Sequence, residues 1–370
     1  MEKVGNQERS VPTPPGPPAP DSGSAEPAGH RDAGLWLTQR HLQIALGLLW
    51  LLDGALQLQP YMFSPDFVAN FLAMNAMDQP HVLGALISGT ARFLLPHAAA
   101  WNALFAAIQL GIGAGILWRK TLRVALAVSF VWTLGVWVVG EGLGSLLTGM
   151  ATLVGGAPGA VLLYGLIGLL VWPTPRRRLE TETAPVAAEG PLGEAGGRAI
   201  WAVLWIGGAI LQVLPGPFLP YSVLSATIAM NESGEPTVLA HIDHFVARLS
   251  TRIGNPLELA LAILEMLIGV QVLRGGRQLR VYLRAGVALS LIFWVLGQNF
   301  GGILAGTATD PNAGPLYVLL ALVLYPRGLT IATTTPVHER PRFTAHRGVN
   351  EALPWRRADQ ADAVVQERTY

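Results

Sequence analysis

The sequence predicts an all-α, polytopic membrane protein with about eight transmembrane helices, arranged as two parallel-repeated four-helix bundles. Three observations predict this fold class. The chain of 370 residues is 51% hydrophobic and only 13% charged, whereas soluble domains carry about 25% charged residues. It contains many apolar runs of the length that a bilayer requires, and its second half repeats residues of its first half in order. The spans are expected to be helical, because lipid offers no partner to unpaired backbone groups.

Eight segments are predicted to cross the membrane. In chain order they run from His41 to Gln59, His97 to Trp118, Leu122 to Leu147, Pro158 to Trp172, Arg198 to Leu214, Asn255 to Leu273, Val281 to Leu304 and Ala313 to Tyr325. The fourth and the eighth are short, about 20–23 Å at 1.5 Å per residue. Their ends are therefore expected to extend into the Gly-rich turns that precede them.

Polar, Pro-rich segments divide the chain. Residues 1–34 have no apolar stretch of the kind found in signal peptides, and they predict a disordered cytoplasmic tail. Residues 327–370 predict a second such tail. A cytoplasmic linker is predicted at residues 174–197. It separates a first four-helix repeat, residues 35–173, from a second one, residues 198–326, and these are called the first half and the second half below.

The basic residues predict the orientation. Most of them gather at the same ends of the spans, as in the runs WRK (118–120) and RRR (176–178), while Arg92, Arg248 and Arg252 are the chief exceptions. The positive-inside rule then puts both termini in the cytoplasm. A ninth span at residues 81–95 is not predicted, because it would move one of the two basic runs to the outside.

The two halves share residues at matching positions, which are called equivalents below. Trp50, Gln57, Pro60 and Phe63 recur as Trp205, Gln212, Pro215 and Phe218; Trp137, Gly140 and Gly144 recur as Trp294, Gly297 and Gly301; Tyr164 and Pro173 recur as Tyr317 and Pro326. Each half has four predicted spans, an even number, so both halves are expected to have the same orientation. The pattern therefore predicts a parallel duplication rather than an inverted repeat.

One repeated phrase contains a carboxylate in an otherwise apolar run. WVVGEGLG (137–144) returns as WVLGQNFG (294–301), so Gln298, with Asn299 beside it, replaces Glu141. The equivalent of Asn102 is Glu258. One carboxylate and one amide are thus kept in each half but on exchanged helices. The hypothesis is that Glu141 lies within hydrogen-bonding distance of Asn102, and Glu258 of Gln298.

Further polar residues fall inside the predicted spans. Gln57 and Gln212 lie at the outer ends of their spans and are expected to join these clusters. Asp53 has Gly208 as its equivalent, and Glu265 has Gln109. Charged groups at such depth usually face a bundle interior or a cavity and are candidate functional residues. The alternative is that these acids are protonated and serve only as polar contacts between helices.

Several classes of protein are disfavoured by the sequence. The chain has no cysteine, which excludes disulfides, thiolate metal sites and iron–sulfur ligation within it. A formal net charge of +1 gives no sign of nucleic-acid binding. The Gly-rich stretches lack a P-loop lysine. His241 and His244 in HIDHF have helical spacing, but a solvated helix face is favoured over a metal site.

The segment ELALAILEMLIGVQVLRGGRQLRVYLRAGVALS (258–290) resembles the DoxX/DoxD-like bacterial membrane proteins, in which a mid-helix Glu is followed by a Gly and then a basic turn. Those proteins are four-helix units, so the chain is similar to two units fused in tandem. Some family members are linked to quinone-coupled sulfur oxidation and others to oxidative-stress complexes with soluble partners. The resemblance implies a quinone-like cofactor and a soluble or membrane redox partner. Gln109 departs from the pattern by replacing the Glu.

Three functions remain open, and catalysis is undecided among them. The first is a membrane subunit that serves a redox partner or binds a quinone-like molecule. The second is a carrier for a small apolar or weakly acidic solute, with Asp53 and Glu265 as proton-linked groups. The third is a non-catalytic membrane scaffold. A roomy apolar pocket that opens to lipid favours the first, a polar cavity that reaches mid-membrane the second, and a dry packed interior the third.

Overall fold

The computed structural model of the chain describes residues 37–174, 183–214, 223–230 and 236–327. The predicted N-terminal tail, residues 328–370 of the predicted C-terminal tail and residues 175–182 of the predicted linker lie outside these residues. The rest of the linker contacts the bundle: Val186 and Ala187 are buried, and the Arg327 N–H donates to the Thr183 carbonyl (3.0 Å).

The described residues are helical and include no strand, which confirms the prediction of an all-helical fold. In chain order the α-helices are α1 (Gln39–Leu56), α2 (His81–Leu94), α3 (Ala98–Leu117), α4 (Leu122–Gly135), α5 (Ala160–Leu170), α6 (Gly193–Val213), α7 (Val223–Met230), α8 (Thr237–Ile253), α9 (Asn255–Arg274), α10 (Leu279–Leu296) and α11 (Ala313–Leu324). Short 3-10 or π segments are η1 (Pro60–Phe63), η2 (Phe67–Leu72), η3 (Leu95–His97), η4 (Val136–Gly140), η5 (Gly142–Ser145), η6 (Val186–Glu189) and η7 (Asn299–Ala305).

Five helical runs among the described residues are long and apolar enough to cross a membrane. They are His81–Leu117, Leu122–Gly140, Gly193–Val213, Asn255–Arg274 and Leu279–Ala305. The helices α5 and α11 are apolar but only 11 and 12 residues long. The chain therefore has the composition and helix lengths of a multi-pass membrane protein, although helix length alone identifies fewer spans than the eight predicted.

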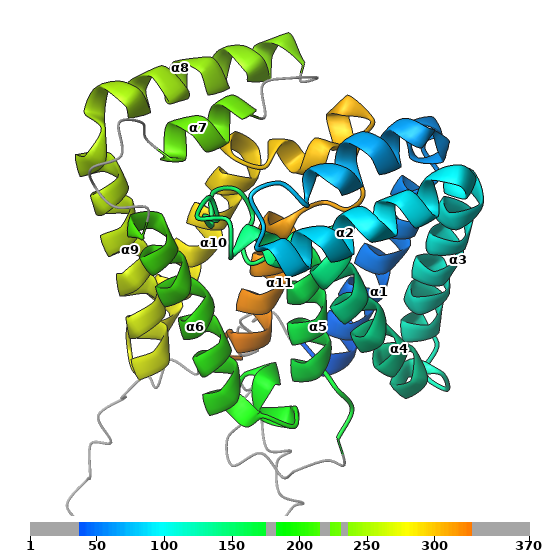
Figure 1. Ribbon diagram of the computed structural model, residues 1–370. Coiled ribbons are helices and arrows are strands. Elements are labelled where there is room, and N and C mark those ends of the chain that lie inside the picture. Colours follow the sequence, from blue (N-terminus) through cyan, green and yellow to red (C-terminus); the bar gives the residue numbers. More distant parts are fainter. Residues whose placement is uncertain (1–36, 175–182, 215–222, 231–235, 328–370) are drawn as a thin grey trace, which may run out of the picture. The chain divides into compact units, whose positions relative to one another are not determined.

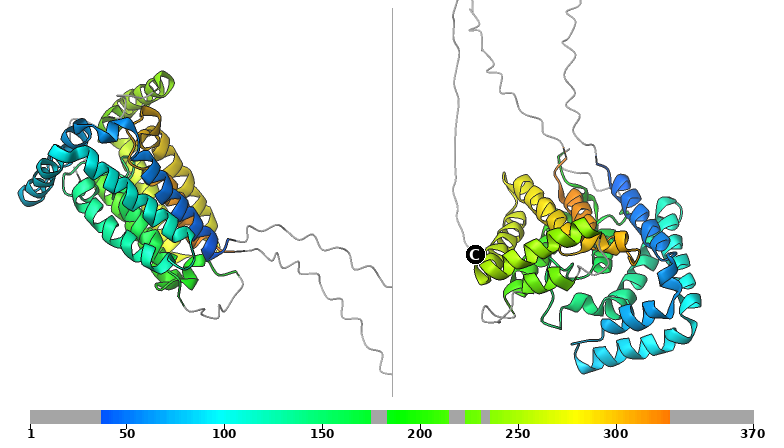
Figure 2. Two further views of the ribbon diagram at one scale, coloured as in Figure 1. Left: turned by 90° about the vertical axis from the view of Figure 1, so that its right-hand side faces the viewer. Right: turned by 90° about the horizontal axis from the view of Figure 1, so that it is seen from above.

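The long helices lie beside one another, and α2, α7 and α8 lie at one end of them (Figures 1 and 2). Helix α1 packs against α3, and α6 packs against α9; α4 contacts α5, and α10 contacts α11. Helices α5 and α11 also contact each other between the two groups (Figure 1). The pair α5 and α11 thus joins helices of the first half to helices of the second.

Small residues allow the two closest helix pairs to form. A Cβ atom at Gly113 of α3 would lie 2.8 Å from the backbone of α1 at Gly47, and one at Gly269 of α9 would lie 2.8 Å from the Ile206 side chain of α6. Membrane helices lack a hydrophobic driving force toward each other and rely on such close packing. Trp50 with Tyr164 and Trp205 with Tyr317 fill the adjoining core, with ring centroids 4.6 and 5.7 Å apart.

Two helices end earlier than the sequence predicts. The third predicted span extends to Leu147, but the helical run from α4 ends with η4 at Gly140. The seventh extends to Leu304; its α-helix α10 ends at Leu296, and the run continues to Ala305 as the kinked 3-10 segment η7. The reason is a left-handed backbone just beyond each end. Leu143 and Gly144 have φ of 58° and 62°, and Phe300 and Gly301 have φ of 51° and 72°. Hydropathy does not reveal these turns, because it carries no information on the sign of φ, and polar residues such as Glu141 and Gln298 also occur within membrane helices.

Candidate functional site

The chain reverses in the same way after α4 and after α10. The Trp137 indole N–H donates to the Pro158 carbonyl (2.7 Å), and the Trp294 indole N–H donates to the Pro311 carbonyl (2.6 Å). These two tryptophans are equivalents in the sequence. Each one connects the end of a long helix to a proline two residues before a short helix, so each short helix is held beside the helix that precedes it.

Glu141 and Gln298 complete the two reversals. Glu141 Oε1 accepts a hydrogen bond from the N–H of Val161, the second residue of α5 (3.0 Å). Gln298 Oε1 accepts one from the N–H of Gly314, the second residue of α11 (3.1 Å). The first N–H groups of a helix have no partner within it, and lipid supplies none. The polar residue in each apolar phrase therefore caps the next short helix.

The predicted side-chain pairs are wrong. Asn102 does not bond Glu141; its Nδ2 donates to the Gln57 carbonyl (2.7 Å). Glu258 does not bond Gln298, and its Oε1 accepts from the Leu224 N–H (3.1 Å). Each of these side chains instead bonds a backbone group at a helix end, where the helix itself leaves backbone groups without partners. Matched depth in the membrane did not bring the side chains of different helices together.

A cavity of about 1280 Å³ lies among elements of the first half and the reversal before α11. Aromatic side chains form part of its wall: Phe93, Trp101, Phe105 and Trp132 follow one another with centroid distances of 5.4, 6.3 and 5.6 Å. Ligand pockets are commonly about 300–1,000 Å³. The space is therefore large enough for a molecule of lipid size.

Five of the nine predicted site residues line this cavity. They are Asp53, Gln57, Asn102, Glu141 and Gln298. The other four do not line it. They are Gln212, Glu258, Glu265 and Asn299. Among these four, Asn299 lies in the left-handed turn after α10, and Gln212 and Glu265 are fully buried in the second half without a hydrogen-bond partner for their side chains among the described residues.

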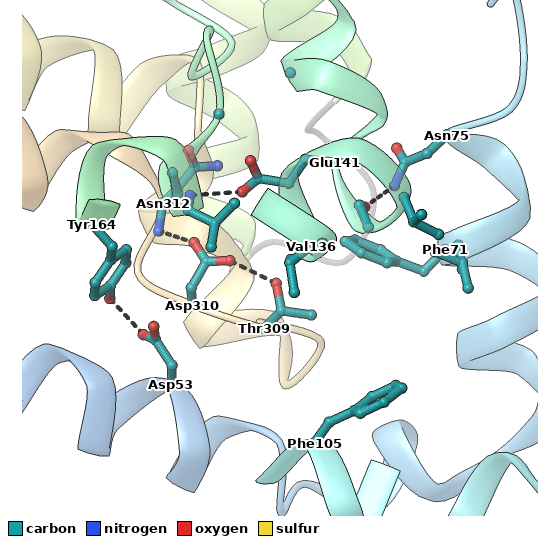
Figure 3. Close-up of a pocket in the computed structure, with 18 of the residues that line it drawn as sticks. Asp53, Phe71, Asn75, Phe105, Val136, Glu141, Tyr164, Thr309, Asp310 and Asn312 are labelled. Carbon is teal, nitrogen blue, oxygen red and sulfur yellow. Dashed lines mark hydrogen bonds between the residues drawn. The ribbon is translucent and has the colours of Figure 1, made fainter. Parts of the chain in front are cut away.

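Three carboxyl groups face the cavity from different parts of the chain (Figure 3). Asp53 on α1 accepts a hydrogen bond from the Tyr164 hydroxyl of α5 (2.7 Å). Glu141 follows η4. Asp310 precedes α11 and accepts hydrogen bonds from the Thr309 hydroxyl (2.8 Å) and the Asn312 N–H (2.7 Å). Both Asp53 and Glu141 are close enough to Asp310 for their negative charges to repel.

Sequence reasoning missed Asp310. It lies between predicted spans in a turn, so it carried no signal of an acid in lipid, and its equivalent is Ala157. Burial nevertheless raises the pKa of Asp310, and the hydrogen bonds from Thr309 and Asn312 offset this only in part. A signal existed in the comparison of the halves, because Asp310, like Asp53, is an acid that replaces a small residue of the other half.

The segment between α1 and α2 closes one side of the cavity. Asn75 Nδ2 donates to the Gly140 carbonyl (Figure 3), and Gln79 Nε2 donates to the Gly142 carbonyl (2.9 Å). Phe67, Phe71 and Leu72 of η2 contribute to the apolar wall. The segment that follows η2 is therefore held to the end of η4 and to the turn after it by side-chain hydrogen bonds to backbone carbonyls.

Among the described residues of the second half, the position beside Gly208, the equivalent of Asp53, is occupied by a side chain. A Cβ atom at Gly208 would lie 2.3 Å from Cγ and Cδ1 of Leu153, which comes from the reversal of the first half. The Leu153 carbonyl accepts from Gln298 Nε2 (3.3 Å), and Val154 lies against Gly297. The first-half segment 151–157 therefore fills the position in the second half that corresponds to the cavity of the first.

Loop length explains this asymmetry. The bonded tryptophan and proline are 21 residues apart in the first half and 17 apart in the second, a difference of four. The longer connection reaches α6 at Gly208. The shorter one reaches only the end of α1, where Gln59 Nε2 donates to the Ala308 carbonyl (3.0 Å). The space beside Asp53 is consequently left open.

Comparison with known proteins gives no relative. No family model matches the chain, and neither a curated protein nor a solved structure matches it. The case for a function therefore depends on the geometry of the cavity and on the residues that line it.

Proposed function

We propose that this chain is a multi-pass membrane protein that binds an amphiphilic molecule, one with an apolar body and a polar head, in the cavity of its first half. The observation that supports this is the cavity itself, about 1280 Å³ in volume, with an aromatic and aliphatic wall and polar groups gathered around Asp53, Glu141 and Asp310. Ligand sites usually combine an apolar lining with a few placed polar groups. A scaffold protein has no need of this space.

The membrane topology belongs to the same proposal. It has eight spans, both termini in the cytoplasm and a parallel duplication. The repeated hydrogen bonds of Trp137 and Trp294 and the repeated caps of Glu141 and Gln298 support the duplication, and the distribution of basic residues supports the orientation. In this topology α5 and α11 are short spans in the protein interior. Both are almost fully buried by their neighbours, so they do not need the full apolar length of a lipid-facing helix.

The resemblance to DoxX-like proteins supplies the proposed context. On this resemblance, we propose that the protein belongs to a bacterial plasma membrane. A quinone-like molecule is then the first candidate ligand, and a redox protein is the first candidate partner. The cavity has room for a quinone with an isoprenoid tail. Trp50 and Trp132 line the cavity, and their indole N–H groups have no partner among the described residues. Each is a potential donor to a ligand oxygen.

A carrier is the second candidate function. The three carboxyl groups favour it, because acids in a membrane protein that face a cavity commonly mark the path of a proton or a substrate. Asp53 remains a candidate proton-linked group of the carrier, because it lines the cavity. Glu265 is less favoured, since it does not line the cavity.

The test blocks the cavity with a side chain. Gly135 on α4 lines the cavity, and a Cβ atom added there meets nothing within 4 Å. Gly111 on α3 is equally open, but it does not line the cavity. The full chain and the variants Gly135→Phe and Gly111→Phe are purified from native membrane, and their bound small molecules are extracted and identified by mass spectrometry.

The wild-type protein and Gly111→Phe should retain an amphiphile in near-stoichiometric amount. Gly135→Phe should retain less, by about tenfold or more, which corresponds to about 1.4 kcal/mol of binding free energy. Equal retention by all three proteins, or retention of nothing by the wild type, would contradict the proposed function.

A further inference from the structure

The charges that line the cavity are unbalanced. Asp53, Glu141 and Asp310 are its carboxyl groups, and the residues that line it include no lysine, arginine or histidine. A carboxylate shielded from water is costly unless a cation or several donors accompany it. Among the described residues, the Tyr164 hydroxyl donates to Asp53, the Val161 N–H donates to Glu141, and Thr309 and Asn312 donate to Asp310.

Further acceptors in the same cavity lack partners. Glu141 Oε2, Asn102 Oδ1, Gln57 Oε1 and Gln109 Oε1 are buried and accept no hydrogen bond from the described residues. The side chains of Asn102, Gln57 and Gln109 are only 1%, 5% and 7% exposed, and all three residues line the cavity. Buried polar atoms in folded proteins are almost always bonded. The four oxygens therefore point to a ligand that brings hydrogen-bond donors.

A metal ion does not fit this arrangement. Among the residues that the structure describes, no group of three acidic or histidine side chains could hold one. The carboxyl groups come from α1, from the turn after η4 and from the segment before α11, and they surround a space rather than a point (Figure 3). An organic head group with several N–H donors can reach acceptors that are spread in this way.

We propose that the ligand of this cavity is an amphiphile with a cationic ammonium head, which binds at Asp53, Glu141 and Asp310 while its apolar body lies along the wall of Phe93, Trp101, Phe105 and Trp132. This inference rests on the proposed function and narrows its ligand class. Aromatic faces also favour a nearby cation. The raised pKa of Asp310, caused by burial, has the expected consequence that protons compete with the cation for this carboxyl.

The test measures the preference for the head group. Radiolabelled dodecylamine is bound to the full chain in phosphatidylcholine nanodiscs, with protein-free nanodiscs as the blank, and 1-dodecanol and dodecanoate compete for the site. Dodecylamine should bind about tenfold more tightly than 1-dodecanol, and dodecanoate should compete least. The affinity for dodecylamine should increase as the pH rises, because Asp53, Glu141 and Asp310 then lose their protons; Tyr164 is the other titratable residue that lines the cavity.

Two matched double variants identify the groups responsible. Glu141→Gln with Asp310→Asn removes two carboxyl groups from the cavity and should abolish the preference for the amine. Glu258→Gln with Asp66→Asn makes the same chemical changes at residues that do not line the cavity and should keep it. Gln298 already performs the capping role of Glu141 in the second half, so the first double variant is expected to fold.

The possible results distinguish a failure of the cationic head group from a failure of the proposed function, on which this inference rests. Tight binding of 1-dodecanol that Gly135→Phe abolishes, without a preference for the amine, would uphold the proposed function and overturn the cationic head. A preference that survives in Glu141→Gln with Asp310→Asn would also overturn it. If this variant does not fold, loss of the preference for the amine in the wild-type protein at low pH supports the inference, and a preference independent of pH contradicts it.

Discussion

Glu141 shows how a carboxylate can be useful in an apolar stretch. Its Oε1 accepts the Val161 N–H at the start of α5, a donor that neither the helix nor lipid can satisfy. The positive end of the helix dipole lies at the same place and favours an acceptor there. Gln298 performs the same task with a neutral amide. In both halves the side chain accepts a hydrogen bond from a backbone N–H at the start of a short helix, and this does not require a charge.

The first prediction follows from that equivalence. Glu141→Gln should unfold at nearly the same temperature as the wild-type protein, because an amide oxygen can accept from Val161. Glu141→Leu should lose about 1–3 kcal/mol, since it leaves a buried N–H without a partner. Thermal unfolding in detergent measures both. A Gln variant as unstable as the Leu variant would show that the charge, not the acceptor, matters.

A second prediction at this scale concerns pH. Burial raises the pKa of Asp310 in the folded protein, whereas an unfolded aspartate titrates near 3.9. The stability that this group contributes is therefore complete below the unfolded value and is lost as the pH rises through the raised value. Asp310→Asn should show a smaller fall in unfolding temperature over this range than the wild type. The exposed Asp66→Asn should keep the wild-type profile, and identical profiles for all three proteins would contradict the prediction.

At the scale of elements, the segment 151–157 decides which half is open. It is not helical, yet Leu153 and Val154 are buried at 2% and 1% exposure. Leu153 lies against Gly208, and Gly297 leaves room for Val154. A buried segment without helical bonds needs other partners for its backbone. Gln298 Nε2 and the Tyr317 hydroxyl supply them to the carbonyls of Leu153 (3.3 Å) and Ala157 (3.4 Å).

The third prediction compares two neighbouring glycines of α6. A Cβ atom at Gly208 would overlap Leu153, whereas one at Gly207 meets nothing within 4 Å. Gly208→Ala should cost about 1–3 kcal/mol through overpacking. Gly207→Ala should be neutral or stabilise by up to about 1 kcal/mol, because alanine favours a helix. Unfolding temperatures of both variants test this.

Adding Leu153→Ala completes the test. The shorter side chain should relieve the overlap, so the double variant Gly208→Ala with Leu153→Ala should be less unstable than the sum of its two single changes. Additive losses, or a Gly208→Ala variant as stable as Gly207→Ala, would mean that the segment does not press on α6 at this point.

For the whole molecule, the two halves share a plan but differ in use. Their reversals repeat the same tryptophan bond, the same cap and the same left-handed turn. The carboxyl groups that face the cavity, in contrast, have Gly208, Gln298 and Ala157 as their equivalents. The first half therefore surrounds an open, acidic space, whereas the corresponding position beside Gly208 is filled by Leu153. A protein built in this way needs both halves to form a single site, because Asp310 comes from the second.

The fourth prediction tests the proposed topology. Reporter fusions at Thr183 and at the C-terminus should both report the cytoplasm, and a fusion near Asp78 should report the outside, because the basic runs gather at one side of the spans. The contacts of residues 183–197 with the bundle end agree with a linker that stays on one side. An external signal at Thr183 would exclude an even number of spans before it.

The sequence by itself determined the helical membrane class and the places where polar residues interrupt apolar runs. Composition and run length decide these, because lipid acts on each segment separately and leaves the helix as the available solution. The repeated phrase around Glu141 and Gln298 also identified two positions of the same kind. Five of the nine candidate residues then proved to line one cavity.

Only the tertiary structure decided which groups meet. Glu141 bonds a helix start rather than Asn102, Asp310 joins Asp53 at the cavity, and Leu153 fills the space over Gly208. Each of these depends on the direction in which the chain reverses after a long helix. That direction is set by left-handed residues and by a difference of four residues in loop length, and neither appears in the hydrophobic pattern, because hydropathy carries no information on the sign of φ or on the path of a loop.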